Sequence, residues 1–304
     1  MRSRIPFVLR AGISAAILFL ILSRTSLEDL AVRAKGAGLA PLTAALLLVV
    51  LMAVLVSLRW RLLAGWMGLA LSPRLAARAV FLGLFGGQVL PSAIGTDLLR
   101  GWVVAARTGR IRSVAASVVA DRLVALFAAC LLLAISYPAL GQVPVPLAGI
   151  LAPAAILASG AVLLVFLLGC TRALRPVLGI QIRLLEELDA VGGLKLTPGP
   201  VVAAILVAVA IHAIAVVVAA SSAAAYGVNA SLGVWLSIIP LSVIACAVPV
   251  SINGWGVREA VIVALAAGHG IPQVEALLVS LTLGALNVVA SLPGAYLMLQ
   301  QPRG

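Results

Sequence analysis

Charged residues are scarce in this chain. Asp, Glu, Lys and Arg make up only 10% of its 304 residues, whereas soluble proteins average about 25%. Hydrophobic residues account for 63% of the chain, and the mean hydropathy is +1.23. No stretch is polar for long enough to form a soluble domain. We therefore predict an all-α polytopic membrane protein, with residues 1–304 forming a single integral membrane domain.

Cysteines and enzyme motifs are equally sparse. The three cysteines, Cys130, Cys170 and Cys246, stand alone in or beside apolar runs, and their spacing fits neither a metal site nor a disulfide framework. The chain contains no P-loop, G-x-S-x-G or H-E-x-x-H pattern. We expect no cofactor, no metal and no catalytic residue, and we favour a function other than catalysis.

Acidic residues are few beside the basic ones, with nine against 21, for a net charge of +12. Such an excess suggests nucleic acid in a soluble protein, but in a membrane protein it indicates the positive-inside rule and anionic lipid. We therefore expect no nucleic-acid partner. We expect the protein in the cytoplasmic (inner) membrane. Placing the basic segments on its cytoplasmic side puts both termini in the cytoplasm. These segments are 2–10, 59–78, 100–112, 172–195 and Arg303.

Long apolar runs of about 20 residues predict six full transmembrane helices, at 5–22, 41–58, 113–136, 147–170, 199–223 and 275–299. Two further apolar stretches, 77–106 and 234–268, are interrupted. We interpret each as a broken, re-entrant helical hairpin, the alternative being a full crossing. With a first half at 5–136 and a second half at 147–299, the charge distribution makes the two hairpins an inverted repeat. Residues 23–38 and the amphipathic connector 172–198 are expected on the membrane surface.

The two interruptions share a pattern. In the first, Pro91 is followed three residues later by Ile and nine residues later by Arg100. In the second, Pro249 is followed by Ile and by Arg258 at the same distances. Broken backbone persists in a bilayer only where it is buried in protein or lines a watery cavity. Paired breaks in the two halves of a transporter-like chain point to its binding site.

Ionisable residues inside apolar stretches are the main site candidates. Each costs on the order of 2.5–3.5 kcal/mol at a helix centre, so they are not expected to face lipid. Either they form ion pairs that fix helix packing, or they line a cavity for an anionic or zwitterionic headgroup. The six are Asp97, Arg100, Asp121, Arg122, Arg258 and Glu259.

Neighbouring residues complete the candidate site. Gly254 and Gly256, with Asn253 before them, allow the backbone to approach a ligand closely. Arg59 and Arg61 flank a tryptophan at the end of a span, a pattern of interfacial anchoring, with headgroup contact as the alternative.

We expect Arg258 and Arg100 to hold a phosphate or other anionic headgroup. Asp97, Asp121 and Glu259 would orient these arginines. The partner is then a membrane lipid with an anionic headgroup or a lipid phosphate, and the function is that of a lipid flippase or transporter. An integral-membrane lipid-modifying transferase stays open as an alternative. So does an accessory subunit of lipid or glycolipid biosynthesis, acting with a lipid-biosynthesis partner or as a homo-oligomer.

Two motifs resemble those of a known family. The run from Pro91 to Arg100 resembles the P-x-x-x-G-x-D-x-x-R element of the lysylphosphatidylglycerol synthase transmembrane-region family, whose members are flippase-like. The run from Asn253 to Glu259 resembles its G-G-x-G-x-R-E element, with Asn253 in place of the usual glycine. Arg59-Trp60-Arg61 and Asp121-Arg122 occur in the expected order. The resemblance implies lipid handling, without the aminoacyl-transfer domain of the full-length synthases.

Overall fold

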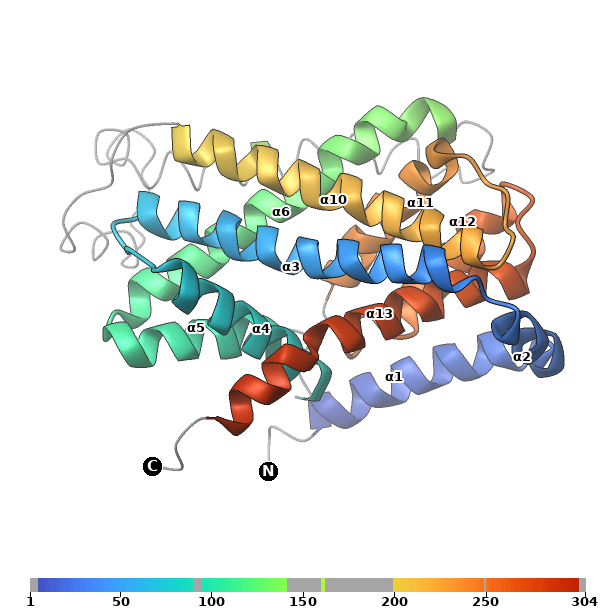
Figure 1. Cartoon of the computed structure of the whole chain (residues 1–304), viewed down its shortest axis with the longest axis horizontal. Helices are drawn as coiled ribbons and strands as arrows, with labels where there is room; N and C mark the ends of the chain where they lie inside the picture. The colour runs from blue at the N-terminus through green and yellow to red at the C-terminus, as the bar shows by residue number, and fades with distance from the viewer. Residues whose placement is uncertain (1–4, 90–94, 141–159, 162–198, 249, 301–304) are drawn as a thin grey trace.

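The computed structural model describes residues 5–89, 95–140, 160–161, 199–248 and 250–300. Ten helices and no strand occur in this part of the chain, which confirms the all-α class (Figure 1). They are α1 (Ile5–Leu22), α2 (Leu27–Lys35), α3 (Leu39–Trp66), α4 (Pro73–Val89), α5 (Gly95–Thr108), α6 (Ile111–Leu140), α10 (Gly199–Ala225), α11 (Leu232–Ala247), α12 (Val257–Ala267) and α13 (Gln273–Leu299).

Four helices are long and apolar enough to span a membrane: α3, α6, α10 and α13. They confirm the spans predicted at 41–58, 113–136, 199–223 and 275–299, although α3 extends to Trp66. Helix α1 has the bounds predicted from the sequence, and its apolar part, Leu9–Leu22, is shorter than these four spans. The predicted span 147–170 lies outside the described residues except for 160 and 161, and so does the connector 172–198.

Both interrupted stretches form helix pairs. Helices α4 and α5 pack against each other on either side of the first break, and we call them the first hairpin. Helices α11 and α12 do the same around the second break and form the second hairpin. Residues 90–94 and 249, where the two prolines lie, are outside the described chain.

The two hairpins begin at opposite ends of the helical bundle. Helices α3 and α10 lie side by side and run in opposite directions (Figure 1). The first hairpin follows α3 and the second follows α10. Because the ends of α3 and α10 lie at opposite ends of the bundle, the hairpins extend toward each other from these ends.

Small residues bring the helices close together. Ala45 and Val49 of α3 are buried in one cluster with Ala219 and Ala223 of α10. In a membrane, such residues let helix backbones approach and gain van der Waals contact. At Gly294 of α13 an added Cβ would lie 2.1 Å from the carbonyl oxygen of Phe81 in α4. Helix α13 therefore packs directly on the backbone of the first hairpin.

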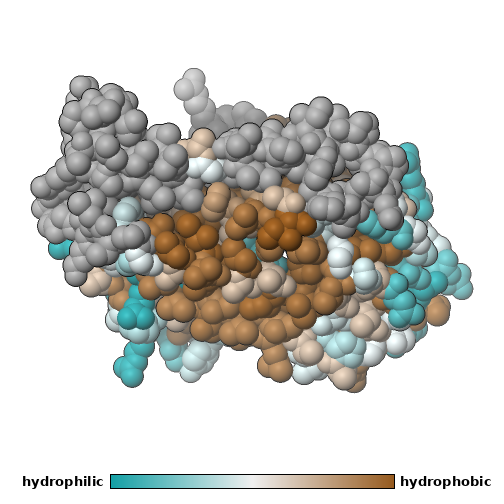
Figure 2. All heavy atoms as spheres, turned by 90° about the horizontal axis from the view of Figure 1, so that it is seen from above, coloured by the Kyte–Doolittle hydropathy of each residue, from teal (hydrophilic) through white to brown (hydrophobic). Residues whose placement is uncertain are grey.

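One face of the molecule is apolar along the bundle and polar toward its ends. Figure 2 shows a broad hydrophobic face, with hydrophilic side chains gathered toward the two ends of the long axis. Helix α2 has no buried residue, and Arg33 ties it to α13 through an ion pair of 2.7 Å with Glu275. This exposed helix fits the surface position expected for residues 23–38.

Candidate functional site

Asp121 of α6 accepts hydrogen bonds from two arginines. Nε and Nη2 of Arg59 donate to its Oδ1 and Oδ2 at 2.6 and 3.0 Å, in the fork geometry that binds a carboxylate most strongly. Nη2 of Arg100 donates to Oδ2 at 2.9 Å. All three side chains are buried, so α3, α5 and α6 are joined by one carboxylate.

Asp97 extends these contacts toward the surface. It lies in the first turn of α5, where its Oδ1 accepts from Nε of Arg100 at 3.0 Å. Its Oδ2 accepts a hydrogen bond from Nε of Arg122 in α6. The Arg122 side chain is 53% exposed. We call these five residues, Arg59, Asp97, Arg100, Asp121 and Arg122, the arginine network; with three arginines and two aspartates, its formal charge is +1.

Aromatic packing fixes the centre of the network. The Arg100 guanidinium carbon lies 4.7 Å from the centroid of the Trp60 ring, a cation–π arrangement. The indole N–H of Trp60 in turn donates to Oγ of Ser117 at 3.1 Å. Nη1 of Arg100 is buried without a hydrogen-bond partner. Arg100 is thus held on three sides, and it is not exposed to a ligand in this conformation.

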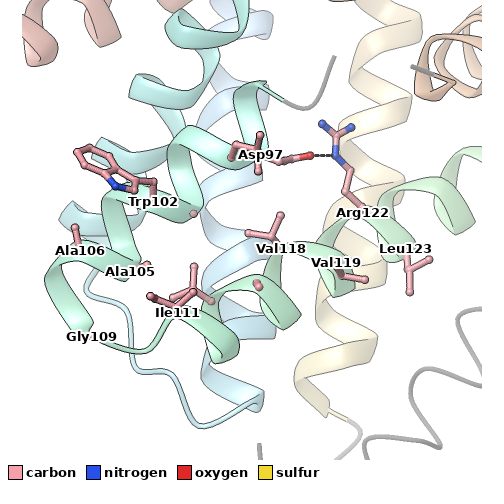
Figure 3. Close-up of a pocket in the computed structure, with 14 residues that line it drawn as sticks. Asp97, Trp102, Ala105, Ala106, Gly109, Ile111, Val118, Val119, Arg122 and Leu123 are labelled. Carbon is pink, nitrogen blue, oxygen red and sulfur yellow. Dashed lines mark hydrogen bonds and ion pairs between the residues drawn. The ribbon is translucent and has the colours of Figure 1, made fainter. Parts of the chain in front are cut away.

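An apolar pocket of about 650 Å³ lies between α5 and α6. Its walls are almost entirely hydrocarbon, from residues such as Trp102 and Ala105 of α5 and Val118 of α6. Figure 3 shows Asp97 and Arg122 facing each other at one end of this pocket. The pocket therefore joins an apolar interior to the exposed end of the arginine network.

Glu259, which has no exposed surface, organises the second break. Nη2 and Nε of Arg258 donate to its Oε1 at 2.6 and 3.1 Å, and Ser280 of α13 donates to the same oxygen at 3.1 Å. Its Oε2 accepts the backbone N–H of Gly256 at 2.6 Å, which closes the first turn of α12. The acid thus caps the helix and orients the arginine.

The residues before α12 adopt left-handed backbone conformations. Asn253, Gly254 and Gly256 have φ values of 49°, 80° and 88°. Glycine takes this region without steric cost, and asparagine is among the few other residues that enter it routinely. Asn253, where the resembling motif has glycine, is therefore compatible with the turn.

Arg258 lies on an aromatic surface. Its guanidinium carbon is 4.8 Å from the centroid of the Trp255 ring, and its side chain is 14% exposed. Gly284 of α13 makes room for this pair, because a Cβ there would lie 2.5 Å from Nη2 of Arg258. Sequence reasoning missed Gly284, since a single glycine in an apolar helix carries no signal of its partner.

The tips of the two hairpins are bonded to each other. Nδ2 of Asn253 donates to Oε1 of Gln88, near the end of α4, at 2.8 Å. The structure therefore brings the two interrupted stretches together. The arginines of the two breaks have different partners, however: Arg100 bonds Asp97 and Asp121, whereas Arg258 bonds Glu259.

Arg59 and Arg61, which flank Trp60, differ in their surroundings. Arg59 is only 5% exposed and belongs to the arginine network, where it pairs with Asp121 in the interior. Arg61 is exposed, and its Nε donates to the carbonyl oxygen of Leu71 at 3.2 Å. His212, alone in its span, bonds the carbonyl oxygen of Ala125 at 2.9 Å, an ordinary structural contact.

Comparison with known proteins identifies a family. No curated protein and no solved structure matches the chain. Residues 7–294 match the family described as "Lysylphosphatidylglycerol synthase TM region". This match covers nearly the whole chain, including both charged breaks, and it confirms the family to which the two motifs pointed. The protein therefore belongs to the lysylphosphatidylglycerol synthase transmembrane-region family and is a multi-pass membrane protein.

Proposed function

We propose that this protein moves a lipid with an anionic headgroup between the leaflets of the cytoplasmic membrane. The observation that carries the proposal is the junction of the arginine network with the apolar α5–α6 pocket. A lipid has the same two parts, a charged head and a hydrocarbon chain. Ionisable groups inside a membrane protein are candidates for substrate pathways.

The hairpin arrangement supports movement rather than binding alone. The first hairpin follows α3 and the second follows α10, at opposite ends of the bundle (Figure 1). Their tips meet at Gln88 and Asn253. Two broken segments meeting midway are the architecture in which transporters expose one site to each face in turn. In this proposal both hairpins are re-entrant and both termini are cytoplasmic.

Arg258 is the residue proposed to contact the moving headgroup at the second break. Glu259 neutralises it only from one side, and Trp255 supports its guanidinium plane. Arg100 is proposed to act from within the arginine network, as a fixed positive charge. A headgroup passing between these positions is attracted by guanidinium groups that are already held in place.

Leaflet exchange of labelled lipids tests the proposal. The purified protein is reconstituted into liposomes with fluorescent phospholipids or polyprenyl phosphates, and the outer leaflet is bleached with an impermeant reductant. We expect exchange with the wild type and a loss of exchange in Arg258→Ala. Arg24→Ala, which removes an exposed arginine, serves as the matched control and should keep the wild-type rate.

The same assay separates the alternatives. Absence of exchange for every lipid tested, with folded protein in the liposomes, contradicts translocation. It would shift the assignment toward a lipid-modifying transferase or an accessory subunit. Equal exchange in the wild type and Arg258→Ala would instead remove Arg258 from the pathway.

A further inference from the structure

We infer that the α5–α6 pocket seats one hydrocarbon chain of a lipid whose head carries a single negative charge, and that Arg122 binds this head. The inference rests on the proposed function, because it names the lipid class and the contact residue. It transfers the headgroup-binding role at the first break from Arg100 to Arg122.

The charge of the arginine network defines the head. Arg59 and Arg100 are buried against Asp121 and Asp97. The surplus positive charge therefore belongs to Arg122, which shares Asp97 with Arg100 and is half exposed. One bound negative charge brings the network to neutrality. A dianion would exceed this surplus by one negative charge, and a zwitterion would leave it unneutralised.

The orientation of Arg122 leaves part of its guanidinium for a ligand. Its Nε faces Asp97, whereas its two terminal nitrogens point away from that ion pair (Figure 3). Arg122 also lines the pocket itself. A guanidinium group at one end of a pocket can bind a phosphodiester or a carboxylate there.

The pocket suits a single chain. Its volume of about 650 Å³ lies within the roughly 300–1,000 Å³ of sites that hold one small molecule, so we assign a single chain to it. Leu98, Trp102 and Ile111 line it and are exposed. One chain therefore enters the pocket from the bilayer, and the second chain stays among neighbouring lipids.

Gly101 lies between the pocket and α6. A Cβ at this position would meet only Val114 and Val118, each at 3.7 Å, which is ordinary van der Waals contact. Alanine therefore fits here without displacing α6. A leucine would extend into the pocket that Gly101 lines and compete with the lipid chain.

Trp102 provides the probe, because it lines the pocket and is exposed. The full chain is reconstituted into phosphatidylcholine vesicles that contain lipids with brominated chains, which quench tryptophan on contact. The contribution of Trp102 is the difference in quenching between the wild type and Trp102→Phe. We expect phosphatidylglycerol to be preferred over phosphatidylcholine on the order of fivefold, the effect of one arginine on an anionic lipid.

Two further brominated lipids define the head. An oleate analogue carries one negative charge on a carboxylate and should share the preference, whereas phosphatidic acid, which can carry a second charge, should gain nothing over phosphatidylglycerol. Preference for oleate alone assigns the pocket to free fatty acids and overturns binding of a phospholipid with one negative charge. A wild type without preference for either single anion over phosphatidylcholine overturns the whole inference.

Variants test the two halves of the inference separately. Arg122→Gln should abolish the preference, while Arg107→Gln, which removes an exposed arginine of α5, should keep it. If both variants lose the lipid preference equally, the preference comes from general surface charge, and the role of Arg122 is overturned. Gly101→Leu should weaken quenching by every lipid, with Gly101→Ala as its control; unchanged quenching in Gly101→Leu contradicts occupancy of the pocket.

Leaflet exchange, measured on the same preparations, distinguishes this inference from the proposed function. Selective quenching of Trp102 without exchange supports the lipid seat and contradicts translocation. Exchange without selective quenching supports translocation and contradicts the seat.

Discussion

The side-chain amide of Asn253 donates a hydrogen bond of 2.8 Å to Oε1 of Gln88. The two residues are 165 positions apart in the chain and lie at the inner ends of different hairpins. This bond directly links the tips of the two hairpins. Its loss is expected to leave both charged clusters intact, because neither residue bonds an ionised group in the contacts described above.

Substitutions at Asn253 should separate the hydrogen bond from the backbone conformation. Asn253→Gly keeps the left-handed turn and loses only the bond, at about 0.5–1.5 kcal/mol. Asn253→Val also forces a β-branched residue into φ 49°, which adds roughly 1–2 kcal/mol. Thermal unfolding in detergent should therefore rank wild type above Asn253→Gly and Asn253→Gly above Asn253→Val. Equal melting temperatures for the two variants would contradict the left-handed conformation of Asn253.

Asp121→Asn should be among the most destabilising single changes in the first half of the chain. It leaves Arg59 and Arg100 buried around a neutral amide, and breaking a buried ion pair from one side costs about 3–5 kcal/mol. Purified yield and melting temperature measure the effect. Glu28→Gln, on the exposed helix α2, is the control and should melt like the wild type.

Gly284→Ala should impair lipid exchange although it changes no charged or polar group. The added Cβ would lie 2.5 Å from Nη2 of Arg258 and 2.6 Å from the Trp255 ring, so Arg258 must leave its position. We expect an exchange rate close to that of Arg258→Ala. Gly65→Ala, where a Cβ meets nothing within 4 Å, should exchange normally. A wild-type rate for Gly284→Ala would show that this position of Arg258 is unimportant.

The bases of the hairpins should be accessible from opposite sides of the membrane. In a cysteine-free background, Arg74→Cys reports the base of the first hairpin and Asn229→Cys the loop before the second; both positions are exposed. An impermeant maleimide added to intact cells should label Asn229→Cys only. Labelling of Arg74→Cys should require an opened cytoplasmic face. Labelling of both from one side rules out the inverted arrangement.

The sequence predicted the spans because helices in lipid must satisfy their own backbone groups over about 20 residues. The charge scarcity likewise indicated that Asp97, Arg100 and Asp121 avoid lipid. The sequence did not predict which charged residues pair with each other. That Arg59 bonds Asp121 follows from how α3 packs against α6, and no local pattern records a contact 62 residues away.

The pocket illustrates the same limit. Trp102, Ala105 and Val118 are unremarkable apolar residues in an apolar chain, and their sequence spacing does not reveal that they enclose a space. Gly284 and Gly294 are informative only once their neighbours are known, since each is needed for a contact with another helix. Sequence thus indicated which residues are costly in a membrane, whereas the helix packing determines which of them meet.

Asp121, the partner of Arg59, is synthesised after Arg59 has left the ribosome. Helix α3 leaves the ribosome before α6, so Arg59 enters the membrane while Asp121, 62 residues further on, has not yet been made. Arg59 lies near the end of α3, and a long arginine stem there can carry its charge to the aqueous boundary. We expect Arg59 first to hold the newly inserted helix at the membrane surface, and to turn inward when α6 is added. The order of translation then determines the order in which the buried charges are neutralised.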